Sequence, residues 1–363
     1  MKKIHSILMA AVLVAGSLTS CSNNDELESK AGQSQQEIKF SANADITRGT
    51  VFTGTAGPND MKVYAFKNTD PATNYINGAT FTKDGDTYSC ATKYYWPTGT
   101  EETDKLTFLA LYPTTNANLT IDDAPTAPSF SYTASATIAE QVDLMAAKSD
   151  ALLLSGTTEG KVALTFGHLL TQVVFKGYVE ESANLIVNVT GIEICNVKST
   201  GTTTTGTTLT AGDTKVNYAI TPATTTLGQG SENAVDLTAT ASSALMLIPQ
   251  TGATAWDTSS SISTNDAGAK NPYIKVSVKI QNKTNNDYVL GTSGTAQDIY
   301  FPLSPNWVAG KKVTYTLQFG ATTGAGNGVG YDGDGNPEEL NATGVTFSAA
   351  VTDWDDVAET ITF

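Results

Sequence analysis

Tyr273-Ile274-Lys275-Val276-Ser277-Val278-Lys279-Ile280 is the stretch that decides the fold class. Apolar and polar side chains alternate along it, and a period of two residues is typical of a β-strand with one buried face. Asn285-Asn286-Asp287 then predicts a turn that returns the chain along Tyr288-Val289-Leu290. The stretch therefore predicts a long, half-buried strand in an antiparallel sheet.

Similar alternating or short apolar runs recur along the chain, while helical patterns rich in Lys and Glu are scarce. Turn signals such as Asp84-Gly85 separate these runs at short intervals. We therefore expect an all-β protein built from β-sandwich domains. The other expected strands cover residues 37–41, 61–66, 87–91, 106–113, 143–147, 162–166, 172–178, 186–197 (as one strand or two), 244–249, 311–319 and 345–351.

Three segments are expected to lie between strands. Residues 114–137 contain Pro125 and Pro128 and are predicted to form a loop. Gly167-His168-Leu169-Leu170 is predicted to form a brief turn or a helical turn. Residues 199–210 are a Thr/Gly low-complexity run, which favours a long, exposed hairpin loop.

Length and charge limit the organisation and the partners of the chain. Its 363 residues favour two domains, and we expect β-sandwiches over residues 49–167 and 168–363. The formal net charge is −15, which disfavours binding to nucleic acid or to an anionic membrane surface. Any attachment to a membrane is therefore expected to depend on a lipid.

The N-terminal residues 1–20 are built like a secretory signal peptide. Lys2 and Lys3 precede an apolar run over residues 7–18, which is too short to span a bilayer as a mature helix. Leu18-Thr19-Ser20-Cys21 resembles the lipobox of bacterial lipoproteins, in which the cysteine thiol receives diacylglycerol. The polar residues 22–26 are then expected to form a solvated tether. The alternative is an ordinary signal peptide that carries a cysteine at its end.

Arg48 is the only arginine among 21 Lys and Arg residues. It follows the expected strand over residues 37–41 and precedes the body of the protein. An arginine-specific or trypsin-like protease therefore finds one arginine, and we predict cleavage between Arg48 and Gly49. The alternative, that Arg48 is one more surface charge, stays open.

The other two cysteines, Cys90 and Cys195, are far apart in sequence and lie in strand-like surroundings. Buried free thiols are favoured over a disulfide between them.

Residues able to carry chemistry are few. His168 is the only histidine after the signal peptide, which excludes sites with several histidines and favours a structural histidine over a catalytic one. Gly328-x-Gly330-x-x-Gly333 has the spacing of a dinucleotide fingerprint but follows no βαβ unit. We therefore predict no enzyme activity and no cofactor.

Two further motifs have residues that occur in binding sites. Asp332, Asp334 and Asn336 alternate as calcium ligands do, but Thr343 stands where a calcium loop has glutamate. A hairpin loop is therefore favoured over a calcium site. Tyr94-Tyr95-Trp96 could stack on a sugar, although aromatic residues beside a buried strand are more often core.

A set of short motifs spans nearly the whole chain. In chain order they are the lipobox, Ile38-x-Phe40-Ser41 followed by Thr47-Arg48, Tyr95-Trp96-Pro97, Asp143-Leu144-Met145-Ala146, Phe166-Gly167-His168-Leu169-Leu170-Thr171-Gln172-Val173, Trp307-x-x-Gly310 and Trp354. Each is weak alone. Together they resemble the fimbrillin or Mfa-like proteins, which are type V pilus subunits of Gram-negative anaerobes.

The resemblance implies a pilin of two transthyretin-like β-sandwich domains, exported by the lipoprotein machinery to the outer membrane. An arginine-specific protease would remove the lipidated segment together with the first strand. The C-terminal strand of another pilin subunit, in a polymer of one kind or of several, would fill the opened place. Its inward side chains would be Val357, Glu359, Ile361 and Phe363. The result would be an extracellular fimbrium that serves adhesion.

Physical principles agree with this scheme, because an opened sheet edge exposes backbone groups that pair with an added strand. The family also includes anchors and tip adhesins. A different class of function, a monomeric surface lipoprotein that binds a glycan or a host ligand, also stays open. The mature N-terminus separates these hypotheses, since a pilin should begin at Gly49 and a retained lipoprotein at acylated Cys21.

Overall fold

The computed structural model describes residues 35–44, 57–67, 74–121, 129–223, 225–238, 244–254, 256–267, 271–320, 328–338 and 345–353. Cys21, Arg48, Gly49, Val357, Glu359, Ile361 and Phe363 lie outside these ranges.

The alternating stretch forms strand β19 (Tyr273–Asn282). Ile274, Val276, Val278 and Ile280 are fully buried on one face, as the period of two predicts. β19 lies between β11 (Leu185–Lys198) and two later strands, β20 (Tyr288–Leu290) and β21 (Gln297–Pro302), and all three pair with it antiparallel. β14 (Lys215–Ile220) pairs with β11 and completes a five-stranded sheet. β11 is therefore one strand, interrupted by two register shifts.

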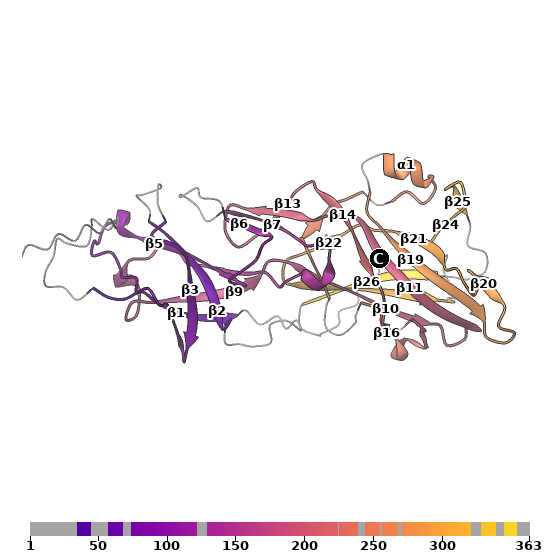
Figure 1. Ribbon diagram of the computed structural model, residues 1–363, viewed down its shortest axis with the longest axis horizontal. Coiled ribbons are helices and arrows are strands. Elements are labelled where there is room, and N and C mark those ends of the chain that lie inside the picture. The colour runs from indigo at the N-terminus through magenta and orange to yellow at the C-terminus, as the bar shows by residue number, and fades with distance from the viewer. Residues whose placement is uncertain are drawn as a thin grey trace, which may run out of the picture. The chain divides into compact units, whose positions relative to one another are not determined.

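A second set of strands forms a closed path, coloured indigo to magenta in Figure 1. Its members, in spatial order, are β1 (Lys39–Ala44), β4 (Thr87–Ser89), β3 (Ile76–Asp84), β2 (Asp60–Lys67), β5 (Leu106–Tyr112), β8 (Met145–Lys148) and β9 (Lys161–His168). The path closes because β1 pairs with both β4 and β9.

The third large sheet has the order β15 (Gly228–Gln229), β10 (Thr171–Val179), β23 (Lys311–Phe319) and β26 (Val345–Asp353), with β16 (Val235–Asp236) and β17 (Leu245–Leu247) also beside β10. Smaller pairs are β18 (Gln250–Thr251) with β22 (Asn306–Trp307), and β24 (Gly330–Tyr331) with β25 (Pro337–Glu338). Helical turns are η1 (Glu102–Asp104), η2 (Ile138–Glu140), η3 (Leu154–Gly156), η4 (Ser231–Asn233) and the short helix α1 (Ile262–Ala267). The all-β fold class is confirmed.

β2 and β5 are buried on both faces. Val63 and Ala65 belong to the core inside the closed path, whereas Tyr64 and Phe66 belong to a second, larger core that also contains residues of β10, β11 and β19. Two covered faces explain why β2 and β5 have continuous apolar runs instead of an alternating pattern. The chain leaves the closed path after His168 and enters the third sheet at Thr171. The domain boundary at 167/168 nevertheless stays a prediction.

The expected loop over residues 114–137 is wrong in part. β6 (Leu119–Ile121) and β7 (Phe130–Thr133) lie within it and pair antiparallel. β7 also pairs with β12 (Thr200–Thr203), far along the chain. The three or four residues of each strand are too few to show a period, and the pairing that stabilises them is distant.

Two other expectations need correction. Residues 199–210 do form a hairpin of β12 and β13 (Thr210–Ala211), but it is not fully exposed, since Thr203 and Leu209 are buried. Gly167 and His168 are not in a turn, because they pair with β8 as the end of β9. Among the described residues, no helix is long and apolar enough to cross a membrane.

Candidate functional site

β1 occupies a place formed by β9, β4 and residues 94–96, which we call the seat of β1. All six residues of β1 pair in parallel with β9, from Lys39 opposite Lys161 to Ala44 opposite Phe166. On the other side Phe40 pairs with Tyr88 of β4. β1 is thus hydrogen-bonded on both edges, although it is the first strand of the described chain.

The inward side chains of residues 38–42 are almost completely buried. Ile38, Phe40 and Ala42 are 2%, 0% and 8% exposed. The ring of Phe40 contacts Phe81 edge-on at a centroid distance of 4.8 Å. Lys39 and Asn43, which point the other way, are exposed. Because burial of a side chain such as Ile or Phe contributes about 1.5–3 kcal/mol, the apolar face holds β1 in its seat.

Residues 94–96 hydrogen-bond to Gln36 and Ile38, which directly precede β1. The Ile38 N–H donates to the Tyr94 carbonyl oxygen at 2.8 Å, and the Trp96 N–H donates to the Gln36 carbonyl oxygen at 2.9 Å. The Gly160 carbonyl oxygen accepts from the Lys39 N–H at 3.2 Å and from the Trp96 indole N–H at 3.0 Å. Trp96 is therefore a buried wall of the seat, which supports the core interpretation of this aromatic motif.

Gly160 allows β1 to approach closely. Its φ is +73°, a conformation that favours glycine. A Cβ there would lie 2.8 Å from the Glu37 carbonyl oxygen and 2.7 Å from the Gln36 side chain. A side chain at position 160 would therefore push the start of the segment out of the seat.

β1 completes both the hydrogen bonds of β9 and the packing around Phe81 and Phe108. If β1 left, the backbone groups of β9 that face it would lose their partners, and the space around Phe81 and Phe108 would open. Unpaired strand edges bind added strands, with main-chain hydrogen bonds giving affinity and side-chain pockets giving specificity. The site suits a β-strand as its ligand.

The sequence singled out the strand in this seat through Ile38-x-Phe40, and the structure places both residues inward. The lipidation and cleavage sites lie outside the described residues, as do all four donor residues. Arg48 follows Ala44 in the sequence by four positions. The roles of these residues stay predictions.

The Asp332 loop is a tight hairpin turn. The Asp332 carboxylate accepts backbone N–H bonds from Asn336 at 2.8 Å and from Asp334 at 3.0 Å. The bond from the Asn336 N–H contributes most to holding the pKa of Asp332 below its ordinary value. These bonds occupy one carboxylate oxygen with the turn itself, which supports the favoured hairpin interpretation.

His168 and Asp143 form a buried pair. The His168 Nδ1 lies 2.8 Å from the Asp143 Oδ1, and both side chains are inside the protein. This position suits a structural role.

Cys90 and Cys195 are free thiols, Cys195 buried and Cys90 half-buried. In the described parts of the chain, no three His, Cys, Asp or Glu side chains gather as a metal site would require.

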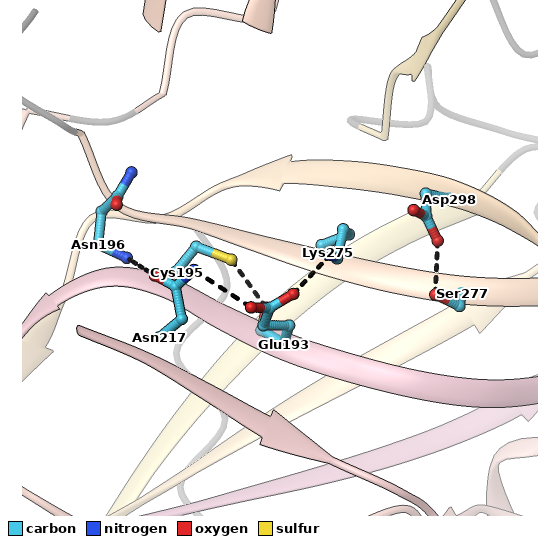
Figure 2. Close-up of polar contacts among 7 residues, drawn as sticks. All are labelled: Glu193, Cys195, Asn196, Asn217, Lys275, Ser277 and Asp298. Carbon is cyan, nitrogen blue, oxygen red and sulfur yellow. Dashed lines mark hydrogen bonds and ion pairs between the residues drawn. The ribbon is translucent and has the colours of Figure 1, made fainter. Parts of the chain in front are cut away.

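Sequence reasoning missed a polar cluster on the five-stranded sheet, drawn in Figure 2. The Lys275 Nζ lies 2.5 Å from the Glu193 carboxylate, which also accepts from the Asn217 Nδ2 at 3.2 Å. Burial alone would lower the pKa of Lys275, but its bond to Glu193 and the nearby charges raise it. The pairing depends on the register that sets Glu193 opposite Lys275. No local signal could have revealed it.

Comparison with known proteins gives a consistent result. A family model described as fimbrillin-like matches residues 47–354. A solved fimbrial protein from Bacteroides vulgatus is 14% identical, with a TM-score of 0.55 over 87% of this chain and 99% of that chain. The fimbrial anchor protein Mfa2 from Porphyromonas gingivalis is 9% identical, with a TM-score of 0.39 over 90% of this chain and 100% of that one. The first likeness shows a shared fold, while the second superposition is too loose to inform the fold. No curated protein matches the chain.

Proposed function

The chain belongs to the fimbrillin-like family, and from this premise we propose that it is a structural subunit of a cell-surface type V pilus that serves adhesion. It is exported as a lipoprotein through Cys21, cleaved after Arg48 and polymerised by strand exchange. Its partners are other pilin subunits, the lipoprotein export machinery and an arginine-specific protease. The lipidated precursor resides in the outer membrane and the mature subunit in the extracellular fimbrium.

The observation that carries the proposal is the position of β1. This strand is hydrogen-bonded on both edges. Together with Ile38 directly before it, β1 contributes Phe40 and Ala42 to the core, and it lies before Arg48 in the sequence. A cut after Arg48 severs it from the rest of the sandwich. The cut does not remove the contacts of β1 by itself, so β1 must dissociate or be displaced before another strand can enter.

The energy of side-chain burial favours displacement of β1 by another strand over spontaneous dissociation of β1. Burial of Ile38 and Phe40 contributes about 1.5–3 kcal/mol each, before the cost of ordering the segment. An incoming strand that replaces both side chains recovers a similar burial energy.

The donor strand and the acceptor site are different surfaces, and each subunit carries one of each. Such heterologous contacts build open filaments.

The mature N-terminus tests the proposal. Mass analysis of protein sheared from cells should find chains that begin at Gly49. Chains that begin at acylated Cys21 and stay monomeric would instead support a retained surface lipoprotein that binds a glycan or a host ligand. Acylated chains found only at the cell-proximal end of fibres would indicate an anchor subunit.

A further inference from the structure

The contacts of residues 36–44 with the seat are unequal along the segment. Residues 36–40, which we call the lock, are bonded on two edges, to residues 94–96 and β4 on one side and to Gly160 and β9 on the other. Residues 41–44, which we call the cut end, pair with β9. In the described parts of the chain, pairing with β4 is limited to the lock. The part closer to the proposed cut is therefore held less firmly.

The side chains of the two parts differ in the same way. Ile38 and Phe40 of the lock are almost fully buried, and the Gln36 Nε2 donates to the Glu159 carbonyl oxygen at 3.0 Å. Among the described side chains of the cut end, Ala42 alone is buried. A methyl group buries far less apolar area than isoleucine or phenylalanine does. Most of the apolar burial therefore belongs to the lock.

On the basis of the proposed lipidation and cleavage, we propose that the seat binds a lipopeptide, the severed segment of residues 21–48. Hydrolysis of the peptide bond after Arg48 consumes one water and gives a carboxylate on Arg48 and an amine on Gly49. It leaves the contacts of the lock unchanged. Cys21, the lipidated residue, lies on the same severed segment as the lock. The cleaved subunit therefore stays attached to the outer membrane without a covalent link, until the segment is displaced.

The order of the contacts favours retention of the severed segment. What the segment loses on cleavage is the high effective concentration that a covalent linker provides. The cut frees it on the side of Ala44, so dissociation begins at the cut end and reaches the lock last. Complete release must then break the two-edged bonding and expose Ile38 and Phe40. Because differences in affinity lie mostly in the dissociation rate, strong contacts that break last make release slow.

The lipid is connected to the firmly held part of the segment. Residues 22–35 join Cys21 to the lock. A force that pulls the subunit away from the membrane therefore acts first on Gln36, whose carbonyl oxygen accepts from the Trp96 N–H at 2.9 Å. It does not peel the segment from the cut end. This order of lipid, tether, lock and cut end suits a noncovalent membrane anchor.

Phase partition in a detergent that separates on warming tests the proposal. The lipidated precursor is purified from membranes and cleaved with an arginine-specific protease, which finds Arg48 as the only arginine. The concentration is kept too low for polymers, which sedimentation checks. We expect the chain that begins at Gly49 to enter the detergent-rich phase together with the severed segment. Monomers of this chain in the aqueous phase directly after cleavage would overturn retention.

Matched substitutions test the role of the lock. Ile38→Ala removes a buried side chain, whereas Lys39→Ala changes an exposed neighbour on the same segment. The dissociation rate of the severed segment should rise on the order of a hundredfold for Ile38→Ala and stay nearly unchanged for Lys39→Ala. A melting curve of each uncleaved variant checks its folding. Ile38→Val, with a rise of roughly fivefold, serves if the alanine variant does not fold. Equal rates for the variants at 38 and 39 would overturn the assignment of the lock.

The same samples separate this proposal from the proposed function. A folded precursor that the protease does not cut after Arg48 would contradict the processing on which both rest. Cleaved chains that leave the detergent-rich phase as monomers when dilute, but polymerise when concentrated, would overturn retention and leave the pilin assignment intact. Cleaved chains that stay in the detergent-rich phase when dilute and reach the aqueous phase only as polymers would support both.

Discussion

The ring of Phe40 meets the ring of Phe108 edge-on, with centroids 5.3 Å apart and planes at 81°. Phe40 lies on the strand before the proposed cut, and Phe108 lies on β5, which remains in the subunit. The contact therefore links the part of the chain that the proposed cut would remove to the part that it would keep. A substitution at Phe40 can therefore be used to detect the release of β1.

Phe40→Ala should destabilise the uncleaved precursor by about 3–5 kcal/mol, because it leaves a cavity between Phe81 and Phe108. Chemical denaturation measures this loss. After cleavage at Arg48 and release of β1, the variant and the unmutated subunit should unfold alike. Phe301→Ala is the matched control, since Phe301 is fully buried elsewhere in the core and should destabilise both forms. A difference between the Phe40 variant and the unmutated chain that persists after cleavage would mean that β1 stays bound.

Cys21→Ala should leave the protein unlipidated and prevent its display on the cell surface, because one cysteine in the lipobox carries the anchor. Surface labelling of intact cells and metabolic labelling with a fatty acid measure the two effects. Normal surface levels of the variant would remove the anchor from the mechanism.

Arg48→Ala should give a full-length, lipidated precursor that folds but does not polymerise, because β1 stays in its seat. Arg48→Lys separates two protease classes, since a trypsin-like enzyme accepts lysine at this position and an arginine-specific one does not. Electron microscopy and gel analysis of surface protein report both outcomes. Fibres of normal length from Arg48→Ala would show that cleavage there is unnecessary.

Deletion of residues 357–363 should leave the melting temperature of the monomer nearly unchanged and abolish self-assembly. Val357, Ile361 and Phe363 could contribute on the order of 1.5–3 kcal/mol each when buried in a neighbour, before ordering costs. Calorimetry of the truncated precursor and light scattering after cleavage measure the two properties. If the truncated protein fails to fold, or still forms fibres after cleavage, the tail is an ordinary core strand.

Stability should fall at alkaline pH partly through Tyr132. Burial raises the pKa of its hydroxyl to about 12, against an opposing effect of its bond to Asn116. Its contribution is complete below the unfolded pKa of about 10 and is lost as the pH rises towards 12. At pH 11 the stability lost through Tyr132 amounts to about 1 kcal/mol. Denaturation of Tyr132→Phe between pH 9 and 11 should show a smaller loss than the unmutated chain, and an equal loss would contradict the assignment.

The sequence by itself determined the elements that depend on local alternation. The period of two in residues 273–280 predicted β19, and Asp84-Gly85 predicted the turn between β3 and β4, because side-chain direction and turn geometry are properties of a few neighbouring residues. The same pattern identified Ile38 and Phe40 as inward residues. A set of short motifs, each weak alone, also led to the family, which the match over residues 47–354 shows.

Only the tertiary structure decided which strands meet. The parallel pairing of β1 with β9, the pairing of β7 with β12 and the ion pair of Glu193 with Lys275 all join residues that are far apart in the chain. An alternating strand offers the same hydrogen bonds to any neighbour, so its partner depends on how the whole core packs. For that reason the sequence could indicate that residues 37–41 form a strand, while the pairing of this strand with β9 and β4 became visible only in the folded chain.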